Sequence, residues 1–258
     1  MKVVILCGGL GTRLSEETNL RPKPMVEIGG SPILWHIMKI YEKHGFNEFL
    51  LPLGYKGDFI KNFFLNYCNF KSDLFLSLSK DIVERKKNEI EDWKLSLVDT
   101  GTSTMTGGRL LRLKDYLKDS GTFMLTYGDG VSDIDISKLI AFHKDHGKLA
   151  TVTAVRPPVR FGELIINNSK VERFEEKPQA KDGWINGGFF VFEPEVLDLI
   201  NDDLTILERE PLEELSKQNE LMAFHHEGFW QCMDTIRDRD YLQDLWAKGN
   251  APWMQKLK

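Results

Sequence analysis

The chain of 258 residues contains little cysteine. Its three cysteines, Cys7, Cys68 and Cys232, are odd in number, far apart and without any C-x-x-C pair. This pattern excludes a disulfide framework or a cysteine-rich zinc site as the organising element of the fold. A chain of this length can bury a sizeable apolar core instead, and the cysteine usage is typical of a reducing compartment such as the cytoplasm.

Long apolar segments and an excess of positive charge are also missing. The apolar run at residues 3–7 is far too short for a secretion signal or a membrane span, which again predicts a cytoplasmic protein. The formal net charge is −5, so we expect no basic surface for nucleic acid or for an anionic membrane. An anionic substrate would have to be bound by a few local cations.

Strand-like and helix-like apolar patterns alternate through residues 1–155. Strands are predicted at 3–7, 48–53, 74–78, 95–99, 122–127 and 149–155, and helices at 32–45, 58–68, 107–117 and 135–146. We interpret residues 80–94 as a charged connector. The alternation predicts an α/β fold with a doubly wound, mostly parallel, Rossmann-like sheet that binds ligands at the carboxyl ends of its strands.

The pattern changes after residue 155. Prolines, glycines and short strands at 163–166, 171–176 and 186–192 predict a smaller part rich in antiparallel strands, and a last helix follows Asp234. We therefore expect one domain over residues 1–258, with halves at 1–155 and 156–258.

A candidate phosphate site follows the first strand, in Gly8-Gly9-Leu10-Gly11-Thr12-Arg13 and then Pro22-Lys23-Pro24. Glycines let the backbone approach a phosphate closely, and Arg13 and Lys23 supply two cations. A Walker A motif is absent, and Leu14 stands where a dinucleotide fingerprint needs its third small residue. The pattern therefore predicts a polyphosphate site, and it argues against a nicotinamide-dependent oxidoreductase.

These motifs resemble the fingerprint of the sugar-phosphate nucleotidyltransferases, which join a sugar 1-phosphate to a nucleoside triphosphate and release pyrophosphate. Four further segments resemble one branch of that family, the glucose-1-phosphate cytidylyltransferases. They are Val98-Asp99-Thr100-Gly101, Thr104-Met105-Thr106-Gly107-Gly108-Arg109-Leu110, Thr126-Tyr127-Gly128-Asp129-Gly130 and Gly228-Phe229-Trp230-Gln231-Cys232-Met233-Asp234-Thr235. One departure is Cys7, where the family motif usually carries alanine.

The resemblance implies a reaction in which CTP and α-D-glucose 1-phosphate give CDP-glucose and pyrophosphate, a product that feeds dideoxysugar synthesis for the bacterial O-antigen. It implies that the first half of the chain mainly binds nucleotide. The residues assigned in this way are Leu6, Gly8, Gly9, Gly11, Thr12, Arg13, Lys23, Thr104, Arg109 and Gly128. Arg13 would neutralise the β- and γ-phosphates, Lys23 would hold the α-phosphate, and Arg109 would meet acceptors of cytosine.

The resemblance also implies a metal and a sugar site. Asp129 and Asp234 would bind Mg²⁺, an ion that prefers carboxylate and phosphate oxygens. The sugar phosphate would contact Tyr127, Gly162, Glu176, Lys177, Asn186 and Gly187. Arg13, Lys23, Asp129 and Lys177 are the expected catalytic residues. Members of the family form homo-oligomers, hexamers among them, and neither nucleic acid nor a membrane is an expected partner.

Two kinds of alternative stay open at this point. One is the same reaction with UTP, dTTP or another hexose 1-phosphate. The other is a catalytically silent subunit that keeps the fold and binds a sugar nucleotide without converting it.

Overall fold

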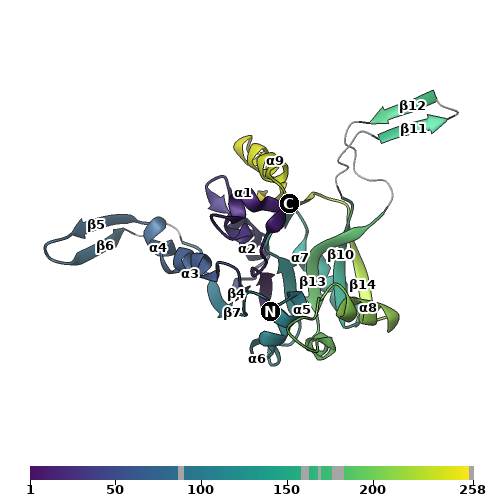
Figure 1. The fold of residues 1–258 in the computed structure, drawn as a ribbon, viewed down its shortest axis with the longest axis horizontal. Coiled ribbons are helices and arrows are strands. Elements are labelled where there is room, and N and C mark those ends of the chain that lie inside the picture. The colour runs from purple at the N-terminus through teal and green to yellow at the C-terminus, as the bar shows by residue number, and fades with distance from the viewer. Residues whose placement is uncertain (87–89, 158–162, 168–169, 176–182, 256–258) are drawn as a thin grey trace.

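A seven-stranded mixed sheet forms the centre of the molecule (Figure 1). The computed structural model describes residues 1–86, 90–157, 163–167, 170–175 and 183–255. The strand order is β14-β10-β13-β8-β1-β4-β7, and β13 alone is antiparallel to its two neighbours in this sheet. These strands are β1 (Val3–Leu6), β4 (Glu48–Leu53), β7 (Lys94–Asp99), β8 (Phe123–Tyr127), β10 (Ala150–Val155), β13 (Ile185–Phe192) and β14 (Leu221–His226). The predicted α/β fold with a mostly parallel sheet is confirmed.

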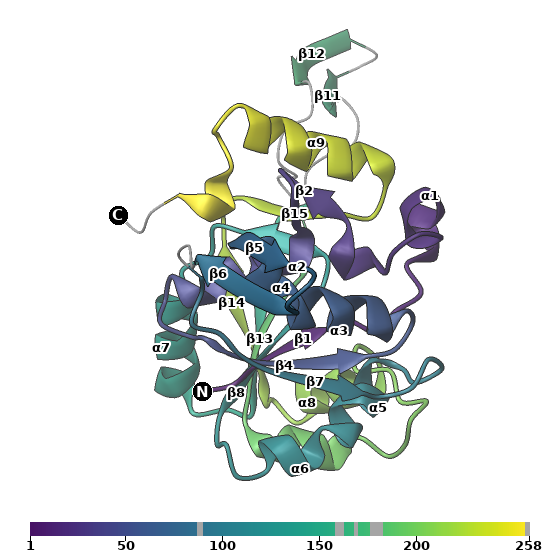
Figure 2. The ribbon, with the colours of Figure 1, turned by 90° about the vertical axis from the view of Figure 1, so that its left-hand side faces the viewer.

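Helices cover both faces of this sheet, and the alternation of β1 shows why. Val3 and Ile5 belong to one apolar cluster, whereas Val4 and Leu6 belong to another on the opposite face. Figure 2 shows α2 and α9 above the sheet and α5, α6 and α8 below it. The helices of the two layers are α2 (Ile33–Glu42), α7 (Ile136–His146) and α9 (Ile236–Ala247), and α5 (Thr106–Arg112), α6 (Lys114–Leu117) and α8 (Glu210–Lys217). Among the described residues, no helix has the length and apolar character needed to cross a membrane.

The helix starts can be explained by local capping, and the start of the last helix bears on the candidate site. Helix α7 begins as predicted, with the Asp135 side chain accepting the N–H of Lys138. Ser31 does not cap α2, because Ser31 and Pro32 form β3 and pair with β2 (Glu27–Ile28). Helix α9 is capped by Thr235 in a capping box with Asp238. The carboxylate of Asp234 is therefore left for another role.

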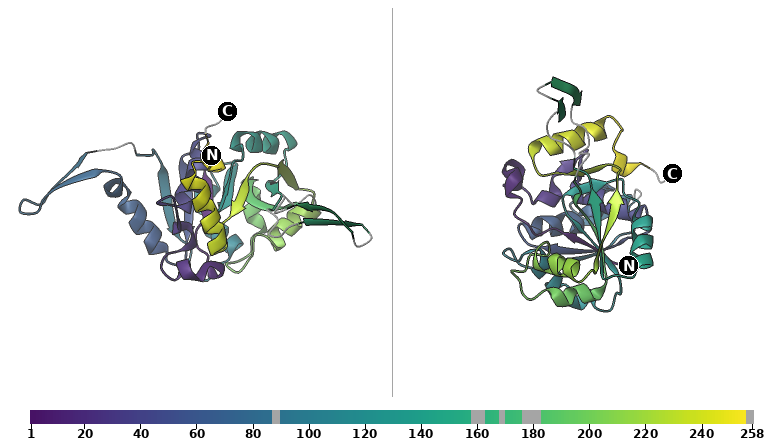
Figure 3. Two further views of the ribbon diagram at one scale, coloured as in Figure 1. Left: turned by 90° about the horizontal axis from the view of Figure 1, so that it is seen from above. Right: turned by 90° about the vertical axis from the view of Figure 1, so that its right-hand side faces the viewer.

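Two hairpins project away from the body in opposite directions (Figures 1 and 3). One consists of β5 (Asp73–Ser77) and β6 (Ile82–Lys86), the other of β11 (Glu163–Asn167) and β12 (Lys170–Glu175). The prediction of a plain charged connector was wrong for β6. Ile82 and Val83 favour a strand, and Asp81 takes the left-handed conformation, with φ 52°, that a tight turn requires.

Two of the predicted helices are each divided into two. Residues 58–68 form α3 (Gly57–Leu65) and α4 (Tyr67–Phe70), separated at Asn66, whose side chain donates to the carbonyl of Asn62 at 2.9 Å. Such a bond from an asparagine side chain competes with the helical pattern of the backbone. Residues 107–117 divide at Leu113 into α5 and α6.

Candidate active site

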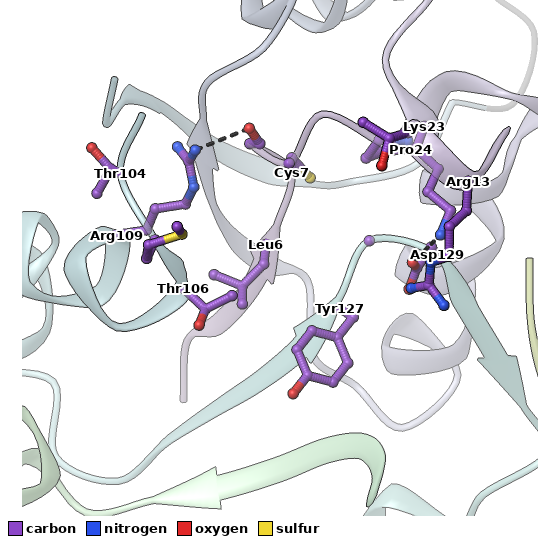
Figure 4. A pocket seen from close by; sticks show the side chains of 16 residues that line it. Leu6, Cys7, Arg13, Lys23, Pro24, Thr104, Thr106, Arg109, Tyr127 and Asp129 are labelled. Atoms are coloured by element: carbon purple, nitrogen blue, oxygen red, sulfur yellow. Dashed lines mark hydrogen bonds and ion pairs between the residues drawn. The ribbon is translucent and has the colours of Figure 1, made fainter. Parts of the chain in front are cut away.

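A cavity of about 370 Å³ opens at the carboxyl ends of β1 and β8, facing α5 (Figure 4). Every residue with a predicted nucleotide contact lines it. The cavity also includes Cys7, Pro24, Met105, Thr106, Tyr127 and Asp129. Figure 4 shows Arg13, Lys23 and Asp129 grouped on one side and Thr104, Thr106 and Arg109 on the other. The structure therefore brings together residues from motifs that lie far apart in the sequence.

Two glycines of the turn after β1 are required by their surroundings. Gly11 has φ 65°, and a Cβ there would lie 2.7 Å from the Thr18 methyl group. A Cβ on Gly8 would lie 2.1 Å from the guanidinium carbon of Arg109. Larger side chains would therefore strain the backbone at Gly11 and displace Arg109 at Gly8.

Arg109 holds three strand ends together. Its Nη1 donates to the carbonyls of Leu53 at 3.0 Å and Gly101 at 2.8 Å, and its Nη2 donates to the carbonyl of Gly8 at 2.9 Å. Nη1 also donates to the Thr100 hydroxyl at 2.7 Å. Burial lowers the pKa of this guanidinium, which stays charged because its ordinary value is so high. The sequence predicted a base-contacting role for Arg109, and the structure adds a structural one.

A compact ion cluster occupies the opposite side of the cavity. The ammonium of Lys23 donates to Asp129 Oδ2 and to Asp234 Oδ1, each at 2.6 Å. Arg13 Nη1 donates to Asp234 Oδ2 at 2.5 Å. Burial alone would lower the pKa of Lys23, but Asp129 and then Asp234 raise it above its usual value. Lys23 is 8% exposed, so this cation is held inside the wall of the site, whereas the Arg13 side chain is 71% exposed.

Backbone pairing explains why the two aspartates meet. Strand β9 (Gly130–Ser132) pairs with β15 (Trp230–Cys232), with Cys232 opposite Gly130. The N–H of Met233 then donates to the carbonyl of Asp129 at 2.8 Å. Asp129 and Asp234 thus stand at neighbouring ends of this short two-stranded sheet.

The donor atoms at this point fit a divalent cation. Asp129, Cys232 and Asp234 each offer one ligand atom, and these atoms lie within 4.8 Å of one another. The ammonium of Lys23, in contact with both carboxylates, is itself a cation at this position. Mg²⁺ prefers oxygen ligands, so the two carboxylates are the relevant pair. Burial and then Asp129 raise the pKa of the Cys232 thiol, which keeps it neutral. Sequence reasoning did not predict that Cys232 lies here.

The residues predicted for the sugar are only partly described. Tyr127 lines the cavity, and its hydroxyl accepts a hydrogen bond from Asn186 Nδ2 at 3.1 Å. Gly187 is buried, with its carbonyl accepting from Trp230 Nε1 at 2.8 Å. Gly162, Glu176 and Lys177 lie outside the described residues.

Glu208 is a site residue that sequence reasoning missed. Its carboxylate accepts hydrogen bonds from Tyr127 and Thr106, each at 2.6 Å. In the sequence, Glu208 stands in an acidic stretch just before α8 and looks like an ordinary residue of a helix start. No local signal distinguishes it, because its two partners are 81 and 102 residues away.

Comparison with known proteins gives matches of three kinds. A model of the family described as Nucleotidyl transferase matches residues 2–238. The chain is 57% identical over 253 residues to glucose-1-phosphate cytidylyltransferases of Salmonella typhimurium and of Salmonella typhi, covering 98% of this chain and 98% of each relative. A crystal structure of UDP-glucose pyrophosphorylase complexed with UDP-glucose has the same fold at 15% identity. The TM-score is 0.67 over 96% of this chain and 98% of the other.

Proposed function

Since this chain belongs to the nucleotidyl transferase family, we propose that it transfers the cytidylyl group of CTP to α-D-glucose 1-phosphate and releases pyrophosphate. The identity with the two Salmonella enzymes extends over nearly the whole chain and supports this assignment. The observation that carries it is the cluster of Lys23, Asp129 and Asp234 at the wall of the cavity. It provides both a cation for phosphate and a pair of carboxylates for a metal.

The reaction needs little covalent help from the protein. A phosphate oxygen of the sugar attacks the α-phosphorus of the nucleotide in line, and pyrophosphate leaves. The obstacle is the approach of two polyanions and the charge that develops on the phosphoryl oxygens. We assign Arg13 to the β- and γ-phosphates and Lys23 to the α-phosphate and the incoming sugar phosphate. Lys177 would be the second cation on the sugar phosphate.

We propose Mg²⁺ as the cofactor, bound by Asp129 and Asp234. When bound, it would neutralise phosphate charge and stabilise the negative charge of the transition state. Lys23 contacts the same two carboxylates with two of its three N–H donors, so it can donate the third to a phosphate or exchange a carboxylate for a phosphate by moving its side chain. Its flexible chain on the Pro22-Lys23-Pro24 segment allows this movement, because the prolines restrict the backbone rather than the side chain.

The nucleotide and the sugar are tested separately. Pyrophosphate release should be fastest with CTP when CTP, UTP and dTTP are compared at equal concentration with glucose 1-phosphate. Equal rates with UTP would contradict the cytidine assignment. The same assay with galactose 1-phosphate and mannose 1-phosphate identifies the sugar. A pure protein that binds CTP but releases no pyrophosphate with Mg²⁺ and any of these sugars would be the silent subunit instead.

Self-association is part of this proposal. The β5–β6 hairpin projects from the body and exposes large apolar side chains, among them Leu74, Phe75, Leu76, Ile82 and Val83. Exposed apolar side chains gathered on one projecting element are typical of a surface that another protein covers. We propose that further copies of this chain cover it in a homo-oligomer, for which a hexamer is the count that the resemblance suggests.

A further inference from the structure

Two hydrogen-bond chains end on the carboxylate of Glu208. Oε1 accepts from the Tyr127 hydroxyl and Oε2 accepts from the Thr106 hydroxyl, both at 2.6 Å. Tyr127 is the last residue of β8, whereas Thr106 is the first residue of α5 on the nucleotide side of the cavity. Glu208 is half-buried and connects these two walls.

The first chain has only one possible direction. A carboxylate accepts hydrogen bonds, so the Tyr127 hydroxyl is the donor in its hydrogen bond to Glu208. The Tyr127 oxygen is then left to accept from Asn186 Nδ2 at 3.1 Å. Asn186 Oδ1 in turn accepts the N–H of Gly188 at 2.8 Å. Each bond fixes the orientation of the next, from the backbone of β13 to Glu208.

This arrangement gives an exposed amide a fixed orientation. Asn186 is exposed to solvent, where an asparagine side chain would ordinarily turn freely. Here both ends of its amide are held. The nitrogen carries a second hydrogen that Tyr127 does not use, and this hydrogen can be donated to a hydroxyl of a bound sugar.

We propose that Glu208 is a positioning residue that orients Tyr127 and Asn186 for the sugar phosphate and thereby helps to select among hexose 1-phosphates. This inference rests on the proposed function, which assigns Tyr127 and Asn186 to the sugar. Glu208 acts through these two residues and does not touch the sugar itself.

The sharpest test is Glu208→Gln, which keeps the shape and replaces one acceptor by a donor. If the amide nitrogen faces Tyr127, the phenol has to turn its proton toward Asn186, whose amide then loses its bond to Gly188. We expect the KM for glucose 1-phosphate to rise by up to about tenfold, the effect of losing one hydrogen bond to a sugar hydroxyl. The preference for glucose 1-phosphate over galactose 1-phosphate should fall as well. The KM for CTP should change by less than about threefold, because Arg109 and the glycine turn keep their contacts.

Two further variants separate positioning from a general structural effect. Glu210→Gln alters an exposed glutamate at the start of α8 and should behave as the unchanged protein. Tyr127→Phe removes the hydroxyl that connects Asn186 to Glu208. Adding Glu208→Gln to Tyr127→Phe should therefore raise the sugar KM no further.

Three results would overturn the inference. They are an unchanged sugar KM in Glu208→Gln, an equal rise in the KM of both substrates together with a lower melting temperature, or additive effects in the double variant. If the unchanged protein converts no hexose 1-phosphate, the proposed function fails first. Calorimetric binding of glucose 1-phosphate to the unchanged protein and to Glu208→Gln then decides the role of Glu208, because equal affinities would exclude it.

Discussion

The ammonium of Lys23 lies 2.6 Å from Asp129 Oδ2, inside the wall of the cavity. A second carboxylate, from Asp234, contacts the same ammonium. This buried lysine therefore neutralises the two groups that we assign to the metal. Its raised pKa keeps it charged at neutral pH, so it can exchange carboxylate partners for phosphate partners without losing its proton.

Replacement of Lys23 should affect turnover and metal binding in opposite directions. Lys23→Ala removes a preorganised cation from the transition state, and kcat should fall about a hundredfold or more. It also removes the cation that competes for Asp129 and Asp234. A manganese titration without nucleotide, followed by electron paramagnetic resonance, should show tighter binding than in the unchanged protein. Lys144→Ala, at an exposed lysine of α7, is the control for both measurements. Unchanged manganese affinity in Lys23→Ala would show that Lys23 does not compete with the metal.

Replacement of Asp129 should lower turnover and weaken metal binding. Asp129→Ala takes away one of the two proposed metal ligands and one partner of Lys23. Turnover should fall about a hundredfold or more, and manganese should bind more weakly than to the unchanged protein. Asp145→Ala removes an exposed aspartate of α7 and should change neither quantity. Normal activity in Asp129→Ala would contradict the proposed metal site.

Replacement of Arg109 should lower stability as well as CTP binding. Arg109→Ala leaves the carbonyls of Gly8, Leu53 and Gly101 without this donor. The carbonyls of Leu53 and Gly8 keep the N–H donors of Thr100 and Tyr55, so mainly the Gly101 carbonyl is left unsatisfied. An unsatisfied acceptor costs about 1–3 kcal/mol, and the free energy of unfolding should fall by about that amount. The KM for CTP should rise, because the wall of the cavity at Gly8 loses its support. Urea unfolding and steady-state kinetics measure the two effects.

The neighbouring Arg112 provides the control for Arg109. It forms an exposed ion pair with Asp203, and such solvent-screened pairs contribute little to stability. Arg112→Ala should therefore unfold nearly as the unchanged protein does. If Arg109→Ala were equally stable and only discriminated less between CTP and UTP, Arg109 would contact the base without supporting the turn.

The sequence predicts the parts of the site that depend on local patterns. The strand, the glycine turn and the cations Arg13 and Lys23 follow from short-range signals, since the turn needs glycine and the phosphates need charge. Asp129 and Asp234 cannot be assigned in this way, because the local sequence around Asp129 is typical of a turn and that around Asp234 is typical of a helix cap. Their approach depends on the pairing of β9 with β15 and on Thr235 taking the capping role at α9.

Long-range hydrogen bonds lie beyond such patterns. Arg109 was expected to contact the base, yet its carbonyl partners at Gly8 and Leu53 are 101 and 56 residues away. Glu208 was not singled out at all. A side chain that bonds the ends of distant strands has no periodicity or spacing of its own, so only the assembled sheet reveals it.

A charge on the β5–β6 hairpin should reduce self-association. Leu76 is 58% exposed there, and Leu76→Glu would place a charge in the apolar surface that we assign to another copy. Light scattering should show a smaller mass than for the unchanged protein, with the same far-ultraviolet circular dichroism. Leu204→Glu, at a leucine 68% exposed and outside the hairpin, is the matched control. An unchanged mass in Leu76→Glu would exclude the hairpin as the contact.

Stability should decrease in mild acid because of His36. Burial lowers the pKa of this histidine to about 4, below its ordinary value. Trp253 Nε1 donates to its Nδ1 at 3.2 Å, so Nε2 carries the proton and donates to the Ile28 carbonyl at 2.8 Å. Acid would add a second proton to the ring, at Nδ1. The unfolded chain, with a histidine pKa near 6.5, binds this second proton more readily than the folded protein does.

The contribution of His36 is therefore complete above about pH 6.5 and is lost progressively as the pH falls toward 4. Between pH 7 and pH 5, the loss of this contribution should lower the free energy of unfolding, measured with urea, by about 2 kcal/mol. His36→Gln lacks the titrating ring, so its stability should fall by about 2 kcal/mol less over the same range. His225→Gln, at an exposed histidine of β14, should keep the full loss. An equal loss in His36→Gln and in the unchanged protein would assign the acid sensitivity to other groups.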